Sequence, residues 1–377
     1  MDDSLEKFAD DLQAVIRRGP AAWEDVFGQD DSFARQALRL FRLQRDRNQT
    51  YRAGFFTPGP GPDDWRRIPA VPAAAFKERD LTAIPAGQRS RTFFSSGTTA
   101  QVPSRHHHHP ASLALYEASL WAWFQRHLLP EIGAPRLPPW QVVSLTPRVP
   151  EAPHSSLAHM FTCVAEHLNR RGAGPGEPTF HGRVDGQGGW RLEVEAVVAS
   201  LEQAVATGRP VLLLGTAFNH VHLLDHLAAV GRRFELAPGS RVLETGGYKG
   251  RSRELARPEL HHALTDILGV PPAWIVGEYG MSELSSQGYD RVAGRTVPRR
   301  FQMPPWARAW VVSPEDGREV PDGGSGLLRL MDLANVWSVL AIQTEDLAVR
   351  RGGAFELVGR APSAEPRGCS LRSIGEN

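Results

Sequence analysis

Hydrophobic residues recur at helical spacing at the start of the chain and again through a long middle stretch. Two amphipathic helices are predicted within residues 1–46, the second running from Phe33 to Leu43 with Ser32 as its cap. Beyond Pro110, helices are expected at residues 113–128, 157–169, 192–207, 217–230 and 254–268, and strands at 140–145, 211–214, 241–245 and 273–276. This alternation predicts a sheet with helices on both faces.

After Arg300 the helical period disappears. Short β-like runs are predicted at residues 310–312, 327–330, 338–342, 347–349 and 355–358, separated by Gly, Pro and Asp. We therefore expect an α/β core over residues 1–300, which includes the N-terminal helices. A small β-rich subdomain of the same unit should cover residues 301–361, and a short tail residues 362–377.

The composition narrows the function classes. Apolar residues make up 41% and charged residues 23% of the 377 residues, which is typical of globular proteins. A net charge of +1, with basic and acidic residues intermixed, argues against a nucleic-acid partner. No segment approaches the roughly 20 apolar residues of a membrane span. The acidic N-terminus does not resemble a secretory signal.

Cys163 and Cys369 are the only cysteines, so neither a disulfide framework nor metal-ligand spacing is present. Cys163 lies between Phe161 and Val164 at an apolar helical position and is predicted to be a core residue. A reducing, cytoplasmic location is expected.

The stretch Ser95-Ser96-Gly97-Thr98-Thr99 follows the apolar pair Phe93-Phe94. Glycine lets the main chain approach an anion closely, and backbone N–H groups and hydroxyls are uncharged donors to phosphate oxygens. The loop lacks the Gly-Lys-Ser/Thr ending of a Walker loop. Taken alone, a Ser/Thr/Gly run of this kind is more often an ordinary turn.

The segment from Gly277 to Glu283 follows an apparent buried strand, where α/β folds commonly place ligand-binding residues. A carboxylate at Glu283 suits Mg²⁺ bound to nucleotide phosphates, and Tyr279 suits stacking on a base. Read alone, Glu283 is a surface or helix-start residue.

Asp346 begins a later β run and Arg360 ends the next one. An aspartate accepts both hydroxyl protons of a ribose, and an arginine binds hydroxyl or phosphate oxygens with its planar fork. Each residue type is also common in β-turns, so neither is diagnostic by itself.

In their order along the chain, these elements resemble the motifs of the acyl-adenylate-forming enzyme superfamily. The similarity is greater to the acyl-protein synthetase family, the long-chain fatty acid–luciferin-component ligases of bacterial luminescence systems. The stretches that carry it are residues 72–77, 153–157, 278–287, 359–362 and 367–371. It extends from about residue 70 to 372.

The resemblance implies the fold of the adenylate-forming-enzyme N-terminal domain and the use of ATP and Mg²⁺. It implies that the chain activates a carboxylic acid as acyl-AMP, with a fatty acid as the expected substrate. The residues expected to bind the nucleotide are Ser95, Ser96, Gly97, Thr98, Thr99, Gly246, Gly247, Tyr248, Glu278, Tyr279, Gly280, Met281, Ser282 and Asp346. Glu283 is the expected Mg²⁺ ligand, Arg360 lies close to the ribose site, and His154 is a candidate for the acyl pocket.

The sequence departs from the superfamily pattern in two places. Val102-Pro103-Ser104 stands where many adenylating enzymes end the phosphate loop with a lysine. Only 17 residues follow Arg360, whereas an independent domain needs at least about 50, so the usual mobile C-terminal domain with its lysine is expected to be absent. Arg105, Lys249 and Arg251 are alternatives for the compensating charge.

Cys369 is the predicted acyl acceptor, because a thiolate attacks an acyl-adenylate to give a thioester and AMP. The bland alternative is a tail cysteine without a role. In the first case, an acyl-accepting partner protein such as a reductase would then take the acyl group. Two other interpretations stay open: a ligase that uses CoA or a carrier thiol directly, and a non-catalytic nucleotide-binding scaffold.

Four adjacent histidines, His106 to His109, are predicted to form a polar loop beside the nucleotide site. Side chains that alternate across a strand, or rotate around a helix, cannot all face one ion. Adventitious metal binding is the minor alternative.

Overall fold

The computed structural model describes residues 4–19, 31–56, 59, 61–95, 102–133, 138–172, 177–186, 189–246 and 255–361. The chain forms two compact units. Unit 1 contains residues 1–123, 280–288 and 300–365, and unit 2 contains residues 124–279, 289–299 and 366–377. Among the described residues, no helix combines the length and apolar character that a membrane span requires.

Unit 1 begins with helices, as predicted. They are α1 (Leu5–Arg18), α3 (Asp31–Arg47) and α4 (Gln49–Phe55). Ser4 caps α1 by accepting a hydrogen bond from the Lys7 amide (3.1 Å), which satisfies one N–H group of the first turn. The predicted cap of the second helix is wrong, because α3 already begins at Asp31 and includes Ser32.

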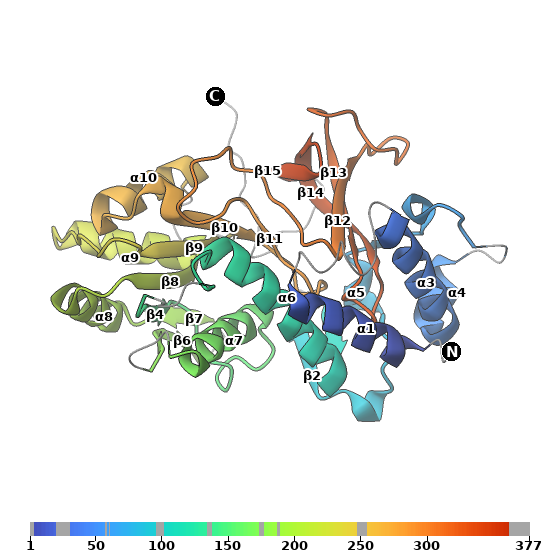
Figure 1. The fold of residues 1–377 in the computed structure, drawn as a ribbon, viewed down its shortest axis with the longest axis horizontal. Helices are drawn as coiled ribbons and strands as arrows, with labels where there is room; N and C mark the ends of the chain where they lie inside the picture. Colours follow the sequence, from blue (N-terminus) through green and yellow to red (C-terminus); the bar gives the residue numbers. More distant parts are fainter. Residues whose placement is uncertain are drawn as a thin grey trace. The chain divides into compact units, whose positions relative to one another are not determined.

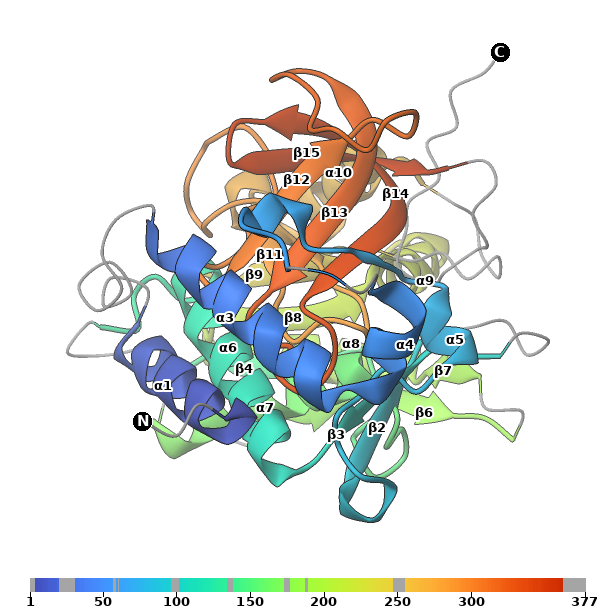
Figure 2. The same cartoon turned by 90° about the vertical axis from the view of Figure 1, so that its right-hand side faces the viewer.

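The β-rich part of unit 1 is a five-stranded sheet built around one long strand (Figure 2). Its members are β1 (Val71–Pro72), β12 (Ala307–Val312), β13 (Ser325–Asp332), β14 (Ala341–Arg351) and β15 (Ala354–Arg360). Strand β14 runs parallel to β1 and antiparallel to β13 and β15. The two runs predicted at 338–342 and 347–349 are therefore one strand, which starts only at Ala341. Val339 and Leu340 are apolar because they are buried in the preceding loop.

A two-stranded hairpin, β2 (Arg91–Phe94) and β3 (Arg105–His108), was not predicted. The remaining elements near it are η1 (Trp65–Arg67), α5 (Ala75–Glu78), η2 (Ala86–Gln88) and α6 (Pro110–Leu128). Helix α6 continues from unit 1 into unit 2.

Unit 2 is organised around a sheet with the order β11-β10-β9-β8-β4-β5. Its strands are β4 (Gln141–Ser144), β5 (Thr179–Phe180), β8 (Val211–Thr216), β9 (Arg241–Thr245), β10 (Ile275–Tyr279) and β11 (Gly288–Tyr289). From β10 to β5 each pair of neighbours is parallel. The strands β8 and β9 are buried along almost their whole length, which explains the continuous apolar run of β8 from Val211 to Leu214.

The helices of unit 2 are α7 (Ser156–Arg170), α8 (Val194–Thr207), α9 (Ala217–Ala229) and α10 (Arg257–Leu268), followed by the 3₁₀ turn η3 (Pro272–Trp274). Right-handed crossovers place α8, α9 and α10 on one face of the sheet, where they share a hydrophobic core (Figure 1). The crossover from β4 to β5 runs in the opposite direction, which places α7 on the other face. The predicted sheet with helices on both faces is confirmed.

A short hairpin of β6 (Gly182–Val184) and β7 (Trp190–Leu192) precedes α8. The helix predicted from Leu192 therefore begins two residues later, at Val194. Cys163 is buried in α7, as predicted.

Candidate functional site

In the β2–β3 hairpin of unit 1, the predicted phosphate loop is part of the segment that connects the two strands. Ser95 and Ser104 join the two strands beyond their last paired residues: the Ser95 amide donates to the Ser104 carbonyl (3.2 Å), and the Ser104 amide donates to Ser95 Oγ (2.9 Å). Ser96, Gly97, Thr98 and Thr99 lie outside the described residues, so their role as phosphate donors stays a prediction.

The histidine tract is a buried strand, so the predicted polar loop is wrong. Residues His106, His107 and His108 belong to β3, and each is at most 8% exposed. Alternation along the strand sends His107 to one face, where its Nδ1 lies 2.9 Å from Thr92 Oγ1 and its Nε2 lies 3.3 Å from Asp80 Oδ1. A buried strand tolerates polar side chains when hydrogen-bond partners are present on each of its faces.

His106, on the opposite face of β3, connects the hairpin to the segment that carries Glu283. It donates from Nδ1 to the carbonyl oxygen of Ser282 (2.8 Å). Burial lowers the pKa of His106 to about 4, although this hydrogen bond and the nearby Glu283 carboxylate oppose the shift. The imidazole is therefore neutral near pH 7, and its Nδ1 proton is fixed by the Ser282 carbonyl.

Residues 280–288 pass through unit 1 as a buried, irregular stretch. Glu283 is 1% exposed and accepts a hydrogen bond from Ser282 Oγ (3.2 Å). Burial of this kind contradicts the interpretation of Glu283 as a surface residue. Gly280 and Met281 precede it in the same stretch, and their predicted nucleotide contacts stay untested.

The donor set around Glu283 suits magnesium held by a nucleotide. Mg²⁺ prefers one or two carboxylates together with substrate phosphates and water. Glu283 supplies a carboxylate and Ser282 a hydroxyl, and the described residues contain no group of three or more His, Cys, Asp or Glu side chains able to hold a metal.

Asp346 and Arg360 face each other in unit 1, as paired positions of β14 and β15. Arg360 donates from Nε to Asp346 Oδ1 (3.1 Å) and from a terminal nitrogen to Glu345 Oε2 (2.9 Å). The guanidinium is thus fixed by two carboxylates. An ionised carboxylate accepts hydrogen bonds at about four sites, the chemistry that a pair of ribose hydroxyls needs.

Glu278 and Thr245 lie side by side at the carboxyl ends of β10 and β9 in unit 2, the edge at which parallel sheets bind ligands. Thr245 donates from Oγ1 to Glu278 Oε2. Burial raises the pKa of Glu278 to about 7, because desolvation and the neighbouring Glu244 charge outweigh the Thr245 hydrogen bond. Tyr279, only 5% exposed, follows directly.

The raised pKa of Glu278 predicts a pH-dependent contribution to stability. The folded protein keeps this proton where the unfolded chain, with a carboxyl pKa of 4.5, has lost it. The stabilisation is therefore complete below pH 4.5 and is lost as the pH rises through about 7, by roughly 3 kcal/mol. Glu278→Gln, neutral throughout, should gain stability relative to wild type across that window in denaturant unfolding. If the difference in the free energy of unfolding between Glu278→Gln and wild type is the same at pH 4.5 and at pH 7, the raised pKa is contradicted.

Glu244→Gln is the control, because the Glu244 pKa is lowered and its contribution to stability depends on pH in the opposite direction. Arg257 and His261 hold the pKa of Glu244 at about 2, despite its burial. This carboxylate therefore stabilises the fold above pH 4.5, and its contribution is lost as the pH falls toward 2.

The other predicted residues are placed only in part. Gly246 directly follows β9, whereas Gly247 and Tyr248 lie outside the described residues. His154 is exposed in the turn before α7, next to Ser155, which caps that helix by accepting from the Ala158 amide (3.1 Å). Its assignment to the acyl pocket stays a prediction.

Two further predictions concern the compensating charge and the acyl acceptor. Arg105 forms an ion pair with Asp80 (Nε to Oδ1, 3.1 Å), so its charge is already partly neutralised. Lys249 and Arg251, the alternatives, lie outside the described residues, as does Cys369.

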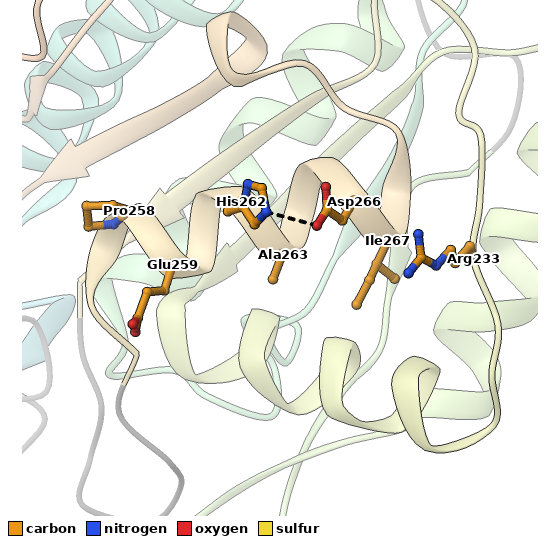
Figure 3. Close-up of a pocket in the computed structure, with 7 residues that line it drawn as sticks. All are labelled: Arg233, Pro258, Glu259, His262, Ala263, Asp266 and Ile267. Carbon is orange, nitrogen blue, oxygen red and sulfur yellow. Dashed lines mark ion pairs between the residues drawn. The ribbon is translucent and has the colours of Figure 1, made fainter.

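A hollow of about 480 Å³ on unit 2 contains none of the predicted site residues, and Figure 3 labels the residues that line it. Most of its lining residues come from α10, including Ala263, Ile267 and the ion pair of His262 with Asp266 (3.1 Å). It offers neither hydroxyl donors nor a glycine turn, so we do not assign the nucleotide to it.

Three functionally suggestive residues were missed from the sequence. Thr245 was assigned only to a strand, although a hydroxyl at the carboxyl end of a buried strand is a usable signal. Asp332 and Asn335, both buried, hold the Glu283 segment through hydrogen bonds. An Asp-Leu-Ala-Asn sequence after an apolar β run is the only trace of them along the chain.

Comparison with known proteins identifies similar sequences. A sequence model of the family described as "Acyl-protein synthetase, LuxE" matches residues 62–376. The long-chain-fatty-acid–luciferin-component ligase of Vibrio harveyi is 23% identical over 189 residues, 48% of this chain and 49% of that protein. The ligase of the same name from Aliivibrio fischeri is 22% identical over 192 residues, 48% and 50% of the two chains. The matched region thus spans about half the length of these curated relatives.

Among solved structures, 2-hydroxyisobutyryl-CoA ligase in an open conformation, in complex with 2-HIB-AMP and CoA, has a TM-score of 0.64. The similarity covers 91% of this chain and 71% of that one, at 14% sequence identity. At this identity the similarity concerns the fold alone. It confirms the predicted α/β fold of adenylate-forming enzymes.

Proposed function

Because the chain belongs to the acyl-protein synthetase (LuxE) family, we propose that it activates a carboxylic acid with ATP and transfers the acyl group to a thiol. The curated relatives are named for long-chain fatty acids and for a luciferin component, so a long-chain fatty acid is the proposed substrate and a protein the proposed final acceptor. A cytoplasmic location is proposed with it, because two cysteines without a pairing framework suit a reducing compartment.

One contact in unit 1 carries this proposal. His106, two residues beyond Ser104, where the connecting segment enters β3, donates to Ser282, whose neighbour is the candidate metal ligand Glu283. The strand that follows the predicted phosphate loop and the segment that carries a carboxylate for Mg²⁺ are thus linked through one buried histidine. The contact supports the proposal, because a Mg-nucleotide site needs phosphate donors and a carboxylate near one another, and Glu283 is buried instead of lying on the surface.

In the proposed reaction, a carboxylate oxygen of the acid attacks the α-phosphorus of ATP, and pyrophosphate leaves with the electron pair of the broken P–O bond. A thiolate then attacks the acyl carbon, the bond to the AMP oxygen breaks, and a thioester and AMP result. Bound Mg²⁺ would supply positive charge to the phosphate oxygens as negative charge develops on them.

The residues of the chain have positioning and electrostatic roles in this scheme. Residues 95–99 would donate hydrogen bonds to the phosphates, and Glu283 would hold the metal ion. Asp346, with Arg360 beside it, would bind the ribose. The segment from Glu278 to Ser282 and the turn from Gly246 to Tyr248 would contact the base, while His154 would face the acyl group.

The proposed acceptor of the acyl group is Cys369, from which it would pass to a partner protein such as a reductase. The position lies inside the region matched by the family model, which ends at residue 376. Nine residue steps separate Arg360 from Cys369, enough for a reach of roughly 30 Å when extended. A thiolate is a much stronger nucleophile than a hydroxyl near neutral pH, which suits a transient acyl carrier.

The test is carboxylate-dependent exchange of radiolabelled pyrophosphate into ATP, measured across a panel of acids. We expect exchange with long-chain fatty acids and little with aryl or amino acids. Exchange restricted to aryl or amino acids would refute the substrate class. If none of the acids in the panel supports exchange, activation by adenylation is refuted.

A further inference from the structure

The loop between β13 and β14, residues 333–340, is buried instead of lying on the surface. Asp332, which ends β13, and the loop residues Asn335 and Ser338 are each at most 2% exposed. Loops usually run over the surface because buried backbone polar groups need partners. The side chains that supply those partners connect this loop to the Glu283 segment on one side and to α3 on the other.

Toward the Glu283 segment, Asp332 and Asn335 form the contacts. Asn335 Nδ2 donates to the carbonyl oxygen of Glu283 itself (2.9 Å). Asp332 accepts from the Ser285 amide at Oδ2 (3.0 Å) and from Ser286 Oγ at Oδ1 (2.8 Å). Together with the His106 hydrogen bond to Ser282, they fix the backbone on both sides of the Glu283 side chain.

The Asp332 carboxylate is itself held in place. It also accepts from the amide of Ala334 at Oδ1 (2.9 Å), while Ser286 Oγ lies 3.0 Å from Ser119 Oγ. Trp306 donates from Nε1 to that Ser119 hydroxyl (2.8 Å). Complete burial raises the pKa of Asp332 to about 6 even with these donors, so the carboxylate is costly to keep ionised in this place.

Toward α3, a single glutamine holds the loop. Gln44 Nε2 donates to the carbonyl oxygens of Asn335 (2.7 Å) and Val336 (3.1 Å), and its Oε1 accepts from the Leu340 amide (3.0 Å). Gln44 is fully buried. It lies before residue 62, where the match to the family model begins, so an N-terminal helix outside that match supports the loop.

We propose that Asn335 and Asp332 are positioning residues that aim the Glu283 carboxylate at the metal ion, with Gln44 of α3 holding Asn335 in place. The inference rests on the proposed role of Glu283 as the Mg²⁺ ligand. In this proposal none of the three side chains would hold the metal ion itself; they would act by fixing the peptide from which Glu283 projects.

The physical reason is that a metal site tolerates only small displacements of its ligands. Loss of a residue that orients a ligand typically weakens metal binding by 10- to 100-fold. Removing the Asn335 amide would leave the buried Glu283 carbonyl without that donor, and the peptide would shift to find another. The carboxylate that projects from it would move with it.

The experiment measures ATP binding by calorimetry with saturating Mg²⁺ and again with EDTA, on wild type, Asn335→Ala and Asn48→Ala. Asn48 is the matched control: its buried amide donates to the Ser338 carbonyl of the same loop (3.2 Å), and its side chain has no hydrogen bond to Asn335 or to the Glu283 segment among the described residues. Asn335→Ala should reduce the Mg²⁺-dependent gain in affinity about tenfold or more. Asn48→Ala should leave that gain unchanged, although both variants lose thermal stability.

The inference would be overturned if Asn335→Ala and Asn48→Ala lost the Mg²⁺-dependent gain in ATP affinity equally, or if Asn335→Ala kept that gain. Should Asn335→Ala fail to fold, Gln44→Ala takes its place in the same comparison. We expect its Mg²⁺-dependent gain in ATP affinity to fall about threefold. An unchanged gain in Gln44→Ala would also overturn the inference. Glu283→Gln separates this inference from the proposed function. If Glu283→Gln keeps the full Mg²⁺-dependent gain, the metal role of Glu283 fails and the positioning role with it; if it loses the gain and Asn335→Ala does not, only the positioning role fails.

Discussion

Replacing Cys369 by serine is expected to abolish stable acyl labelling of the protein while leaving acid activation intact. The acyl-adenylate forms before any thiol is needed, so pyrophosphate exchange should stay within about twofold of wild type. Transfer requires a nucleophile, and a serine hydroxyl near neutral pH is far weaker than a thiolate. Labelling is measured by incubating the protein with ATP, Mg²⁺ and a radiolabelled fatty acid, then counting label that survives denaturation and is released by hydroxylamine.

Cys163→Ser is the control for this experiment. Cys163 is buried in α7, so its thiol is not available to an acyl-adenylate in the folded protein. Labelling should persist in Cys163→Ser. Undiminished labelling of Cys369→Ser would remove the acyl-enzyme step, and release of a CoA thioester on adding CoA would then favour a CoA ligase.

Replacing Glu283 by glutamine is expected to lower pyrophosphate exchange by about a hundredfold or more at a millimolar Mg²⁺ concentration. Glutamine keeps the shape of the side chain but not the charge that attracts the cation. Part of the activity should return as Mg²⁺ is raised, because weaker binding is offset by concentration. The measurement is the exchange rate as a function of Mg²⁺.

Glu195→Gln is the matched control for loss of one negative charge, because the Glu195 side chain is 84% exposed and lies in α8, which carries none of the predicted site residues. It should leave the Mg²⁺ dependence unchanged. A Glu283→Gln enzyme with the Mg²⁺ dependence of wild type would show that another group holds the metal.

The sequence predicts the helices and buried strands of unit 2 well, because their period comes directly from burial. The strand at residues 241–245 is found with the same bounds, and α7 and α9 begin and end within one residue of the prediction. Helix ends are less certain: the run from Leu192 mixes the end of β7 with the start of α8, since both present apolar residues to one core.

The histidine tract and the loop after β13 could not be predicted for the same reason. Both are buried polar or irregular stretches whose partners lie far away along the chain. His106 is stabilised by the carbonyl of Ser282, 176 residues later, and Asn335 by Gln44, 291 residues earlier. No local pattern carries such a partner, so polar residues were assigned to exposed loops and the apolar Val339 and Leu340 to a strand.

In the candidate site too, local sequence patterns predict the residues but not their contacts. Glu283, Asp346 and Arg360 were chosen from the order of motifs along the chain, whereas their immediate environment depends on tertiary contacts. The pairing of Arg360 with both Asp346 and Glu345 needs the β14–β15 register, which the spacing of residues alone does not reveal. The shift in the pKa of Glu278 likewise depends on burial beside Thr245 and Glu244.

Carboxylate-dependent entry of labelled pyrophosphate into ATP, with the unmodified protein and no added thiol, tests acid activation most directly. It reports the reversal of adenylation, before any acceptor is involved. With a long-chain fatty acid and Mg²⁺, labelled ATP should accumulate at a rate that saturates with the acid and falls to the blank when the acid or Mg²⁺ is left out. A protein that binds ATP yet forms no labelled ATP with any acid of the panel would be a nucleotide-binding scaffold, and that result would contradict acid activation by this chain.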